Sequence, residues 1–284
     1  MIELDNVTYR YHGSVIPAVD AVSARIEPGI HLLLGENGAG KTTLIRIIGS
    51  QLLATSGKCM LDGIDASKRI PSELADVIYV GDTTTFPLND IESMARLHAR
   101  FYPGFDSTML HDNLAAFGIN ANMKLSDMSL GMRRKAMVAY ALSLNTRFLL
   151  LDEPTNGLDI ESKERMQRMM AACVSDDTTV IVSTHTISDL LNLYDAVMVM
   201  RAGHLLYTSD TDSIMERVAF VSSFSSVPGS IYSEWVAGQL HSIVPRWLVD
   251  NAMSQSNAVD FRLLYTALHS PASKTVLDTL TIQP

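Results

Sequence analysis

The feature that most constrains the fold is the segment LGENGAGKTTL at residues 34–44, which places three glycines and a lysine between two apolar runs. Gly35, Gly40, Lys41 and Thr42 have the spacing of a phosphate-binding loop. The run HLLLG at 31–35 has the length of a buried strand, and TTLIRIIGSQL at 42–52 carries apolar residues at helical spacing as far as Leu52. The sequence therefore predicts a strand, a glycine loop and a helix in that order.

This loop predicts a nucleotide-binding site. Glycine permits backbone torsions that turn several N–H groups inward, and the N-terminus of the following helix adds partial positive charge. Lys41 would place its charge on the terminal phosphates, and the Thr42 hydroxyl would be a ligand of magnesium. An ordinary glycine-rich turn is the alternative, and the flanking strand and helix argue against it. The loop residues expected to contact ATP are Gly35, Glu36, Asn37, Gly38, Ala39, Gly40, Lys41, Thr42 and Thr43.

A second constellation lies in RFLLLDEPTNGLD at 147–159, where an apolar strand ends in two carboxylates. The carboxyl ends of strands are where open α/β sheets bind ligands, so Asp152 and Glu153 are expected beside the loop. Asp152 can hold magnesium through water, and Glu153 can take a proton from an attacking water. A surface acidic pair that merely ends a strand is the alternative.

The rest of the chain has the pattern of an α/β protein. Residues 2–9 and 19–26 alternate apolar and polar side chains, as half-buried antiparallel strands do. Short apolar runs at 77–80, 148–151, 179–183 and 196–200 each adjoin a helical pattern, which predicts a mainly parallel sheet with covering helices. Between about 86 and 145 only helical patterns occur, which predicts a helical insertion into the domain.

Composition excludes several classes of protein. The net charge is −9 and no block of basic residues occurs, which argues against a broad nucleic-acid surface. Only two cysteines occur, without metal-ligand spacing, so neither a disulfide framework nor a zinc site is expected. No window approaches the roughly 18 apolar residues of a membrane span, so membrane attachment would require a partner.

Over residues 1–215 the chain resembles the ATP-binding subunit of an ABC transporter. The resemblance implies a P-loop NTPase of ABC type, with an antiparallel β subdomain, a mainly parallel core sheet and a helical insertion. Its cofactors would be ATP and Mg²⁺. The family's signature motif fits Met128–Met132, because Ser129 lies 23 positions before Asp152, and another candidate begins at Leu125. Ser129 and Gly131 would then contact an ATP held by a second subunit, although Leu130 and Met132 depart from the motif.

Further residues take their expected roles from this resemblance. His185, in STH after a predicted strand, is similar to the histidine that binds the γ-phosphate and orients the attacking water. Tyr11 is similar to the aromatic residue that stacks on adenine, although Tyr9 would share its strand face. Asp82 stands where the family usually has a glutamine that senses magnesium and the membrane subunit. Asp159 fits both the loop that joins two active sites and a helix cap.

The function that the resemblance implies is an ATPase subunit that powers a membrane transporter. ATP would close two subunits, identical or different, and hydrolysis by Glu153, His185 and Lys41 would reopen them. A separate permease, similar to the ABC-2 type, would hold the subunit at the cytoplasmic face of the membrane, contacting the helical insertion and the Asp82 loop. A non-transport ATPase that acts on the ribosome or nucleic acid, and an ATP-binding regulatory dimer, are the alternatives.

The aromatic tail at 216–284 is expected to fold as a small C-terminal extension. It contains both tryptophans and the segment VDFRLLYTALHS, which resembles a helix that often closes such extensions. We expect it to add to the dimer contact or to regulate closure, and not to carry chemistry.

Overall fold

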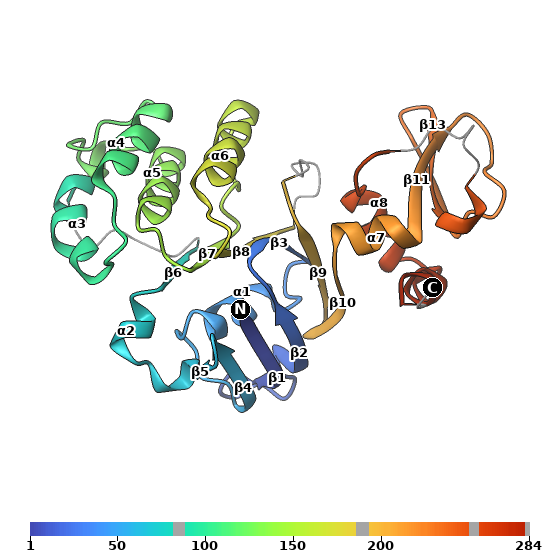
Figure 1. The fold of residues 1–284 in the computed structure, drawn as a ribbon, viewed down its shortest axis with the longest axis horizontal. Helices are drawn as coiled ribbons and strands as arrows, with labels where there is room; N and C mark the ends of the chain where they lie inside the picture. Colours follow the sequence, from blue (N-terminus) through green and yellow to red (C-terminus); the bar gives the residue numbers. More distant parts are fainter. Residues whose placement is uncertain (82–88, 186–192, 250–255, 282–284) are drawn as a thin grey trace.

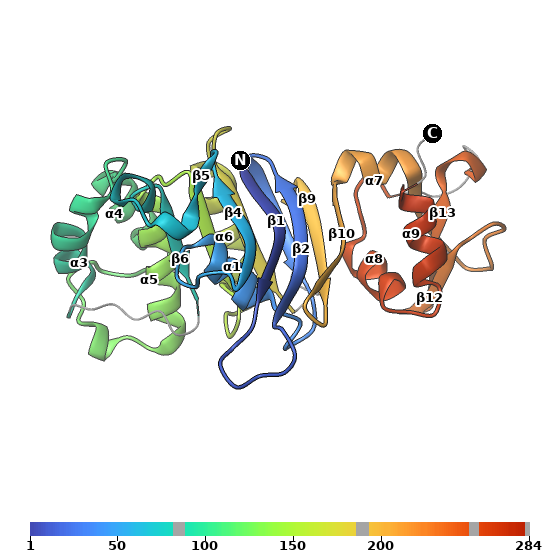
Figure 2. The same ribbon diagram turned by 90° about the horizontal axis from the view of Figure 1, so that it is seen from below.

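The structure, a computed structural model, describes residues 1–81, 89–185, 193–249 and 256–281. Two sheets lie one above the other with helix α1 (Lys41–Ile48) between them, and further helices stand on the far side of the larger sheet (Figure 1). The helical insertion and the C-terminal extension lie at opposite ends of the molecule (Figure 2).

The smaller sheet contains the two predicted N-terminal strands. They are β1 (Ile2–Tyr9) and β2 (Val19–Ile26), and they pair antiparallel with each other. β1 also pairs with β4 (Ser56–Leu61), and β5 (Ile64–Asp65) completes the order β2-β1-β4-β5. The inward residues of β1, which are Ile2, Leu4 and Val7, are buried against α1 in one core cluster. This sheet is the predicted antiparallel subdomain.

The larger sheet is the predicted mainly parallel sheet and has the order β10-β9-β3-β8-β7-β6. Strands β9, β3, β8, β7 and β6 form parallel pairs with their neighbours in this order, whereas β10 pairs antiparallel with β9. The predicted strands agree with the structure to within two residues, whereas β10 was not predicted. The strands are β3 (Gly29–Leu34), β6 (Val77–Val80), β7 (Phe148–Asp152), β8 (Thr179–Thr184), β9 (Ala196–Arg201) and β10 (His204–Asp210).

Helix α1 is shorter than the sequence predicts. It ends at Ile48, where Gly49 N–H bonds to Ile45 O and Ser50 adopts a φ of +56°, outside the helical region. The prediction that Leu52 belongs to this helix is therefore wrong. Leu52 still packs on the same core, and its N–H bonds back to Arg46 O in the turn after the helix.

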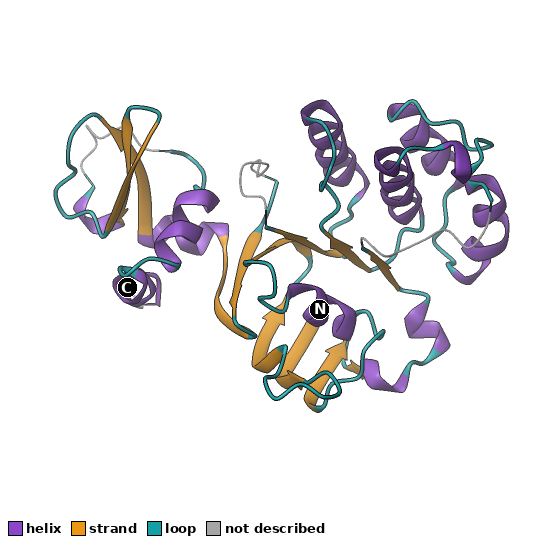
Figure 3. Cartoon of the chain, turned by 180° about the vertical axis from the view of Figure 1, so that it is seen from behind, coloured by secondary structure: helices purple, strands orange, loops and turns teal. Residues whose placement is uncertain are grey.

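Helices alone make up the described part of the insertion, apart from one isolated bridge between Asp90 and Lys124. Helices α3, α4, α5 and α6 stand together over one face of the larger sheet (Figure 3). Asp90, Asp106 and Asp159 each cap the helix that follows by accepting a backbone N–H bond. The helices of the insertion are α3 (Ile91–His98), α4 (Ser107–Ala116) and α5 (Leu130–Ser143), with 3-10 turns at Ala99–Phe101 and Leu125–Asp127; α2 (Pro71–Leu74) precedes the insertion and α6 (Ile160–Cys173) follows it.

The C-terminal part forms a three-stranded antiparallel sheet of order β11-β13-β12 with three helices. Helix α7 spans residues 211–217 and is followed directly by β11. Helix α8 lies within the segment VDFRLLYTALHS, which was predicted to be helical. Phe261 packs edge-on against Tyr194 of the main domain, with ring centroids 5.9 Å apart. The elements are α7 (Thr211–Arg217), β11 (Val218–Ser223), β12 (Tyr232–Val236), β13 (Gln239–Pro245), a 3-10 turn at Arg246–Leu248, α8 (Phe261–Leu268) and α9 (Ser273–Thr281).

Across the described ranges, no helix has both the length and the apolar character needed to cross a membrane.

Because α1 is packed between both sheets, we predict that its core contacts carry much of the domain's stability. Ile48 is fully buried, so Ile48→Ala should lower the free energy of unfolding by about 2–5 kcal/mol. Leu53→Ala, at a half-exposed position just beyond the helix, should change it by no more than about 0.5 kcal/mol. Urea unfolding of both variants measures the difference. Equal effects would show that α1 is not a main part of the core.

Candidate active site

The carboxyl ends of β3, β7 and β8 open into one pocket of about 610 Å³. Every loop residue from Glu36 to Thr43 lines it, whereas Gly35, which was also predicted to contact ATP, is not among the lining residues. The two carboxylates that end β7 and the histidine that follows β8 line it too. Its lining residues are Tyr11, Ala18, Glu36, Asn37, Gly38, Ala39, Gly40, Lys41, Thr42, Thr43, Arg46, Tyr79, Asp152, Glu153, Asn156 and His185.

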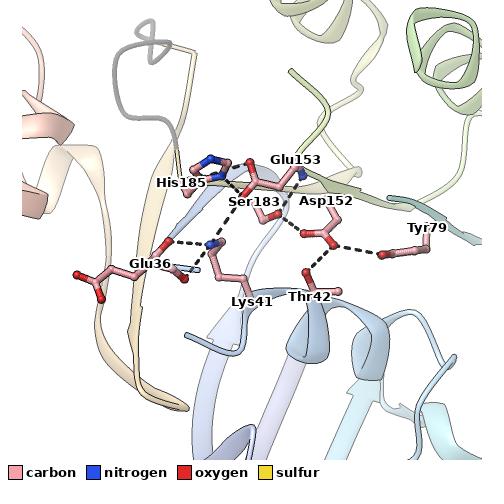
Figure 4. A network of polar contacts seen from close by, with 9 residues as sticks. Glu36, Lys41, Thr42, Tyr79, Asp152, Glu153, Ser183 and His185 are labelled. Carbon is pink, nitrogen blue, oxygen red and sulfur yellow. Dashed lines mark hydrogen bonds and ion pairs between the residues drawn. The ribbon is translucent and has the colours of Figure 1, made fainter. Parts of the chain in front are cut away.

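Lys41 is buried at the floor of this pocket. Its Nζ donates hydrogen bonds to the carbonyl oxygens of Gly35 at 2.6 Å and Glu36 at 3.2 Å, and lies 3.7 Å from Glu153 Oε1 (Figure 4). Burial lowers the pKa of Lys41, while the nearby Glu153 and Asp152 charges act in the opposite direction. The carboxylates thus help to retain a cation where phosphates would sit.

At two positions of the loop, Gly35 and Gly40, neighbouring backbone atoms lie too close for a side chain. A Cβ on Gly35 would lie 2.7 Å from Met200 O, and one on Gly40 would lie 2.3 Å from Ala18 O. Gly40 also has a φ of +104°, which L side chains rarely adopt. The loop can therefore pack against the flanking strands only because these positions lack side chains.

Asp152 is held by hydroxyl groups on both of its oxygens. Thr42 Oγ1 donates to Oδ2 at 2.7 Å, and Ser183 Oγ donates to Oδ1 at 2.5 Å. Charge-assisted bonds of this kind orient a carboxylate strongly. Asp152 and Thr42, predicted from separate motifs, are therefore in direct contact.

Glu153 and His185 form a pair at the mouth of the pocket. His185 Nδ1 lies 2.8 Å from Glu153 Oε1, which is the oxygen that faces Lys41 (Figure 4). Glu153 adopts a φ of +53°, and its N–H is bonded to Ser183 O and Oγ. Such strain in a non-glycine residue persists only where surrounding bonds impose it, and it occurs often at functional sites.

Tyr11 and Tyr9 have different surroundings. Tyr11 lies beyond the end of β1, lines the pocket, and bonds through its hydroxyl to Thr43 Oγ1 at 3.1 Å. Tyr9 packs on the core cluster and meets the Tyr11 ring edge-on, with centroids 4.9 Å apart. The ring exposed in the pocket is thus that of Tyr11.

Ser129 and Gly131 are not among the described residues that line this pocket. Ser129 caps α5 by accepting a bond from Met132 N–H at 3.2 Å, so Gly131 lies in the first turn of that helix. Arg134 on the same helix donates to Asn156 O, in the loop that leads to Asp159. The first turn of α5 and the loop at 156–159 therefore form one surface. Asp82 lies outside the described residues.

Four pocket residues, Ala18, Arg46, Tyr79 and Asn156, were not singled out from the sequence. Arg46 Nε donates to the Tyr79 hydroxyl at 3.3 Å, and that hydroxyl donates to Asp152 Oδ2 at 3.2 Å. Arg46 interrupts the apolar run LIRII, and Tyr79 carries the one hydroxyl of VIYV. These were weak signals, because nothing in the local pattern shows which strands will be neighbours.

The donor set at Thr42 and Asp152 consists of hard oxygen atoms, which suit a magnesium ion. Within the described ranges, no group of three or more His, Cys, Asp or Glu residues could hold a metal. Because Mg²⁺ prefers six oxygen ligands and usually keeps several waters, it would need phosphate oxygens to complete this site. The residues fit an ion that arrives with a nucleotide.

Comparison with known proteins gives one matching family and two relatives, all of them described as transport proteins or their ATP-binding subunits. The family described as ABC transporter matches residues 19–156. The ATP-binding protein NatA of Bacillus subtilis is 31% identical over 228 residues, which cover 76% of this chain and 92% of NatA. The bacitracin transport ATP-binding protein BcrA of Enterococcus faecalis is 26% identical over 250 residues, which cover 85% of this chain and 79% of BcrA.

A solved structure shares the architecture as well. It is the dimeric post-hydrolysis state of the ATP-binding cassette MJ0796 bound to ADP and Pi. The TM-score is 0.63 at 25% sequence identity, and the match covers 74% of this chain and 98% of that one.

The close approach at Gly40 predicts a specific loss of nucleotide affinity. Gly40→Ala should weaken nucleotide binding at least tenfold more than Gly38→Ala. Both positions have positive φ, but an added Cβ at Gly38 meets nothing within 4 Å. Equilibrium binding of a fluorescent ATP analogue in EDTA measures both. Equal losses would mean that strain in φ, and not contact with Ala18, sets the loop geometry.

Proposed function

Since this chain belongs to the ABC transporter family of ATP-binding, ATP-hydrolysing proteins, we propose that the pocket bounded by Lys41, Asp152 and Glu153 is its hydrolysis site. The observation that carries the proposal is the Glu153 side chain, which faces the phosphate-binding loop, touches His185 and lies 3.7 Å from Lys41. The glycine loop, a base and a cation thus meet at one point, which is what phosphoryl transfer to water requires.

The proposed roles follow from the position of each group. Loop N–H groups and Lys41 would bind the β- and γ-phosphates, and Tyr11 would stack on the adenine. Thr42 and Asp152 would hold Mg²⁺, with Asp82 a further candidate, and the ion would neutralise charge that develops on the phosphates. Glu153 would accept the proton of the attacking water.

His185 would orient that water and the γ-phosphate. Its Nδ1 is directed at Glu153 Oε1, so the opposite side of the ring, which carries Nε2, would be the side that reaches a phosphate group. A histidine bonded through one nitrogen to a carboxylate has its tautomer and its ring orientation defined by that bond. Glu153 would therefore act both as the base and as the group that aligns His185.

A second ATPase subunit is part of the proposal. Ser129 and Gly131 lie at the first turn of α5, away from their own pocket, and a helix N-terminus attracts a phosphate group. They would therefore contact the ATP of a partner subunit, identical or different. ATP would close this dimer, and hydrolysis would reopen it.

A separate transmembrane permease is the proposed partner. The relatives NatA and BcrA are described as ATP-binding proteins of transport systems, which supports this proposal. A second cavity of about 340 Å³ lies between β6 and the helical insertion, lined by Met94, His98, Tyr102 and Met137 among others. Leu97 and Phe101 are exposed beside it on α3 and the turn that follows. We place the permease contact here, which would hold the subunit at the cytoplasmic face of the membrane.

The accessory unit at 216–284 would adjust dimer contact or closure. None of its described residues lines the hydrolysis pocket, and α7 follows β10 of the main domain directly. The two alternatives, action on ribosome or nucleic acid and a purely regulatory ATP-binding dimer, gain no support from the relatives found.

Glu153→Gln tests the hydrolysis site. The amide keeps the shape of the side chain but cannot accept a proton, so turnover should fall at least a hundredfold while ATP binding persists. With ATP and Mg²⁺ the variant should also accumulate as a dimer in size-exclusion chromatography. Steady-state phosphate release gives the turnover.

Glu161→Gln on α6, at an exposed glutamate outside the pocket, is the matched control and should keep near-normal turnover. Near-normal turnover in Glu153→Gln would remove Glu153 from the mechanism.

The permease contact predicts an effect of charge at Phe101, which is 70% exposed. Phe101→Asp should reduce co-purification of a polytopic membrane protein with the Glu153→Gln form several-fold, because a charge would be buried in the contact. Phe224→Asp, at a phenylalanine 77% exposed in the accessory unit, should not. Equal recovery with both variants would place the contact elsewhere, and recovery of ribosomal or nucleic-acid partners alone would favour the non-transport alternative.

A further inference from the structure

Tyr79 reaches the active site from a strand that contains no recognised motif. It is buried on β6, and its hydroxyl donates to Asp152 Oδ2 at 3.2 Å (Figure 4). Thr42 Oγ1 donates to the same oxygen and Ser183 Oγ to the other. The Asp152 carboxylate is therefore bonded to three hydroxyl groups from three different elements.

Arg46 determines which way the Tyr79 hydrogen points. Its Nε lies 3.3 Å from the Tyr79 hydroxyl oxygen. A guanidinium group has donors only, so the hydroxyl must accept this bond with a lone pair. Its single hydrogen is then left for Asp152. The order Arg46, Tyr79, Asp152 forms a directed chain of hydrogen bonds.

Gly81 makes room for this arrangement. It lies two residues after Tyr79, so a side chain at this position would point to the same face of the sheet as Tyr79. A Cβ at Gly81 would stand 2.2 Å from the Tyr79 hydroxyl oxygen and 2.7 Å from the ring carbon that bears it. Any side chain at 81 would have to move the phenol away from its present position.

We propose that Tyr79 is a positioning residue for Asp152, which it holds in the orientation that binds the metal ion of the metal–ATP complex. The proposal rests on the proposed role of Thr42 and Asp152 as the metal-binding pair. Among the described residues, Thr42 and Tyr79 donate to Oδ2, so without the phenol this oxygen would keep one of these two donors and the carboxylate would rotate more freely. Groups that orient a metal ligand commonly affect metal affinity by tenfold or more.

The test uses Tyr79→Phe, which removes the hydroxyl and keeps the ring. Mn²⁺ is titrated by electron paramagnetic resonance into the full chain with a non-hydrolysable ATP analogue. Its affinity should fall about tenfold. Binding of the same analogue in EDTA, without metal, should stay within about twofold of the unmodified chain, because Tyr79 is proposed to act through Asp152 and not on the nucleotide.

Three further variants separate positioning from general stability. Tyr140→Phe removes another buried hydroxyl, which bonds to His98 Nδ1 at 2.8 Å outside the pocket, and should leave Mn²⁺ affinity unchanged. Gly81→Ala should reproduce the loss seen with Tyr79→Phe. Arg46→Met should lower Mn²⁺ affinity in the unmodified chain but have little further effect in the Tyr79→Phe chain, since Arg46 is proposed to act through Tyr79.

Unchanged Mn²⁺ affinity in Tyr79→Phe would overturn the proposal. An equal loss of analogue binding with and without metal would also overturn it, because Tyr79 would then act on the nucleotide. Failure of the hydrolysis site itself is a separate result: the unmodified chain would show no Mg²⁺-dependent ATPase activity, whatever the variants bind.

Discussion

The parallel pairing of β3, β8 and β7 is the interaction on which the site depends. Leu34 pairs with Thr184, and Asp152 pairs with Ser183, so all three strands end at nearly the same level. The next residue of each strand, which is Gly35, His185 or Glu153, therefore emerges at one edge of the sheet. Backbone hydrogen bonds align groups that lie up to 150 residues apart in sequence. A slip of one residue in any strand would reverse its side chains and separate the carboxylates from the loop.

The backbone at this edge of the sheet is locally strained, and the surrounding core holds it in place. Gly40 and Glu153 both have positive φ, and the glycine loop packs its backbone directly against Ala18 and Met200. Strain of this kind costs about 1–3 kcal/mol for a non-glycine residue. Beneath it, α1 is buried between two sheets, and Ile45 and Ile48 are fully enclosed. A rigid core thus keeps Lys41 and Thr42 in position at the beginning of the same helix.

Two side chains connect the proposed hydrolysis site with the surfaces proposed to bind partners. Tyr79 lines both the nucleotide pocket and the cavity between β6 and the helical insertion. One side chain therefore separates the proposed metal site from the proposed permease contact. On the other side, Arg134 joins the signature helix α5 to the loop at 156–159. The surface offered to a second subunit consequently includes both segments.

Local patterns in the sequence were sufficient for the glycine loop, the acidic strand end and most strands, because each depends on spacing within a few residues. The ABC fold was expected from the family resemblance that these motifs carry. Local patterns also indicated Lys41, Thr42, Asp152 and Glu153 as site residues, and the resemblance added His185; the structure gathers all five around one pocket. The roles of these residues, and of Ser129 and Gly131, stay predictions.

Tertiary structure alone decided which tyrosine faces the pocket, where α1 ends, and that Arg46 and Tyr79 reach Asp152. It also decided that Gly81 must lack a side chain. The reason is physical: these features depend on which strands become neighbours and on how closely their backbones approach. Residues 46, 79 and 152 come from a helix and two strands whose adjacency no local periodicity encodes, whereas a phosphate-binding loop carries its geometry within its own sequence.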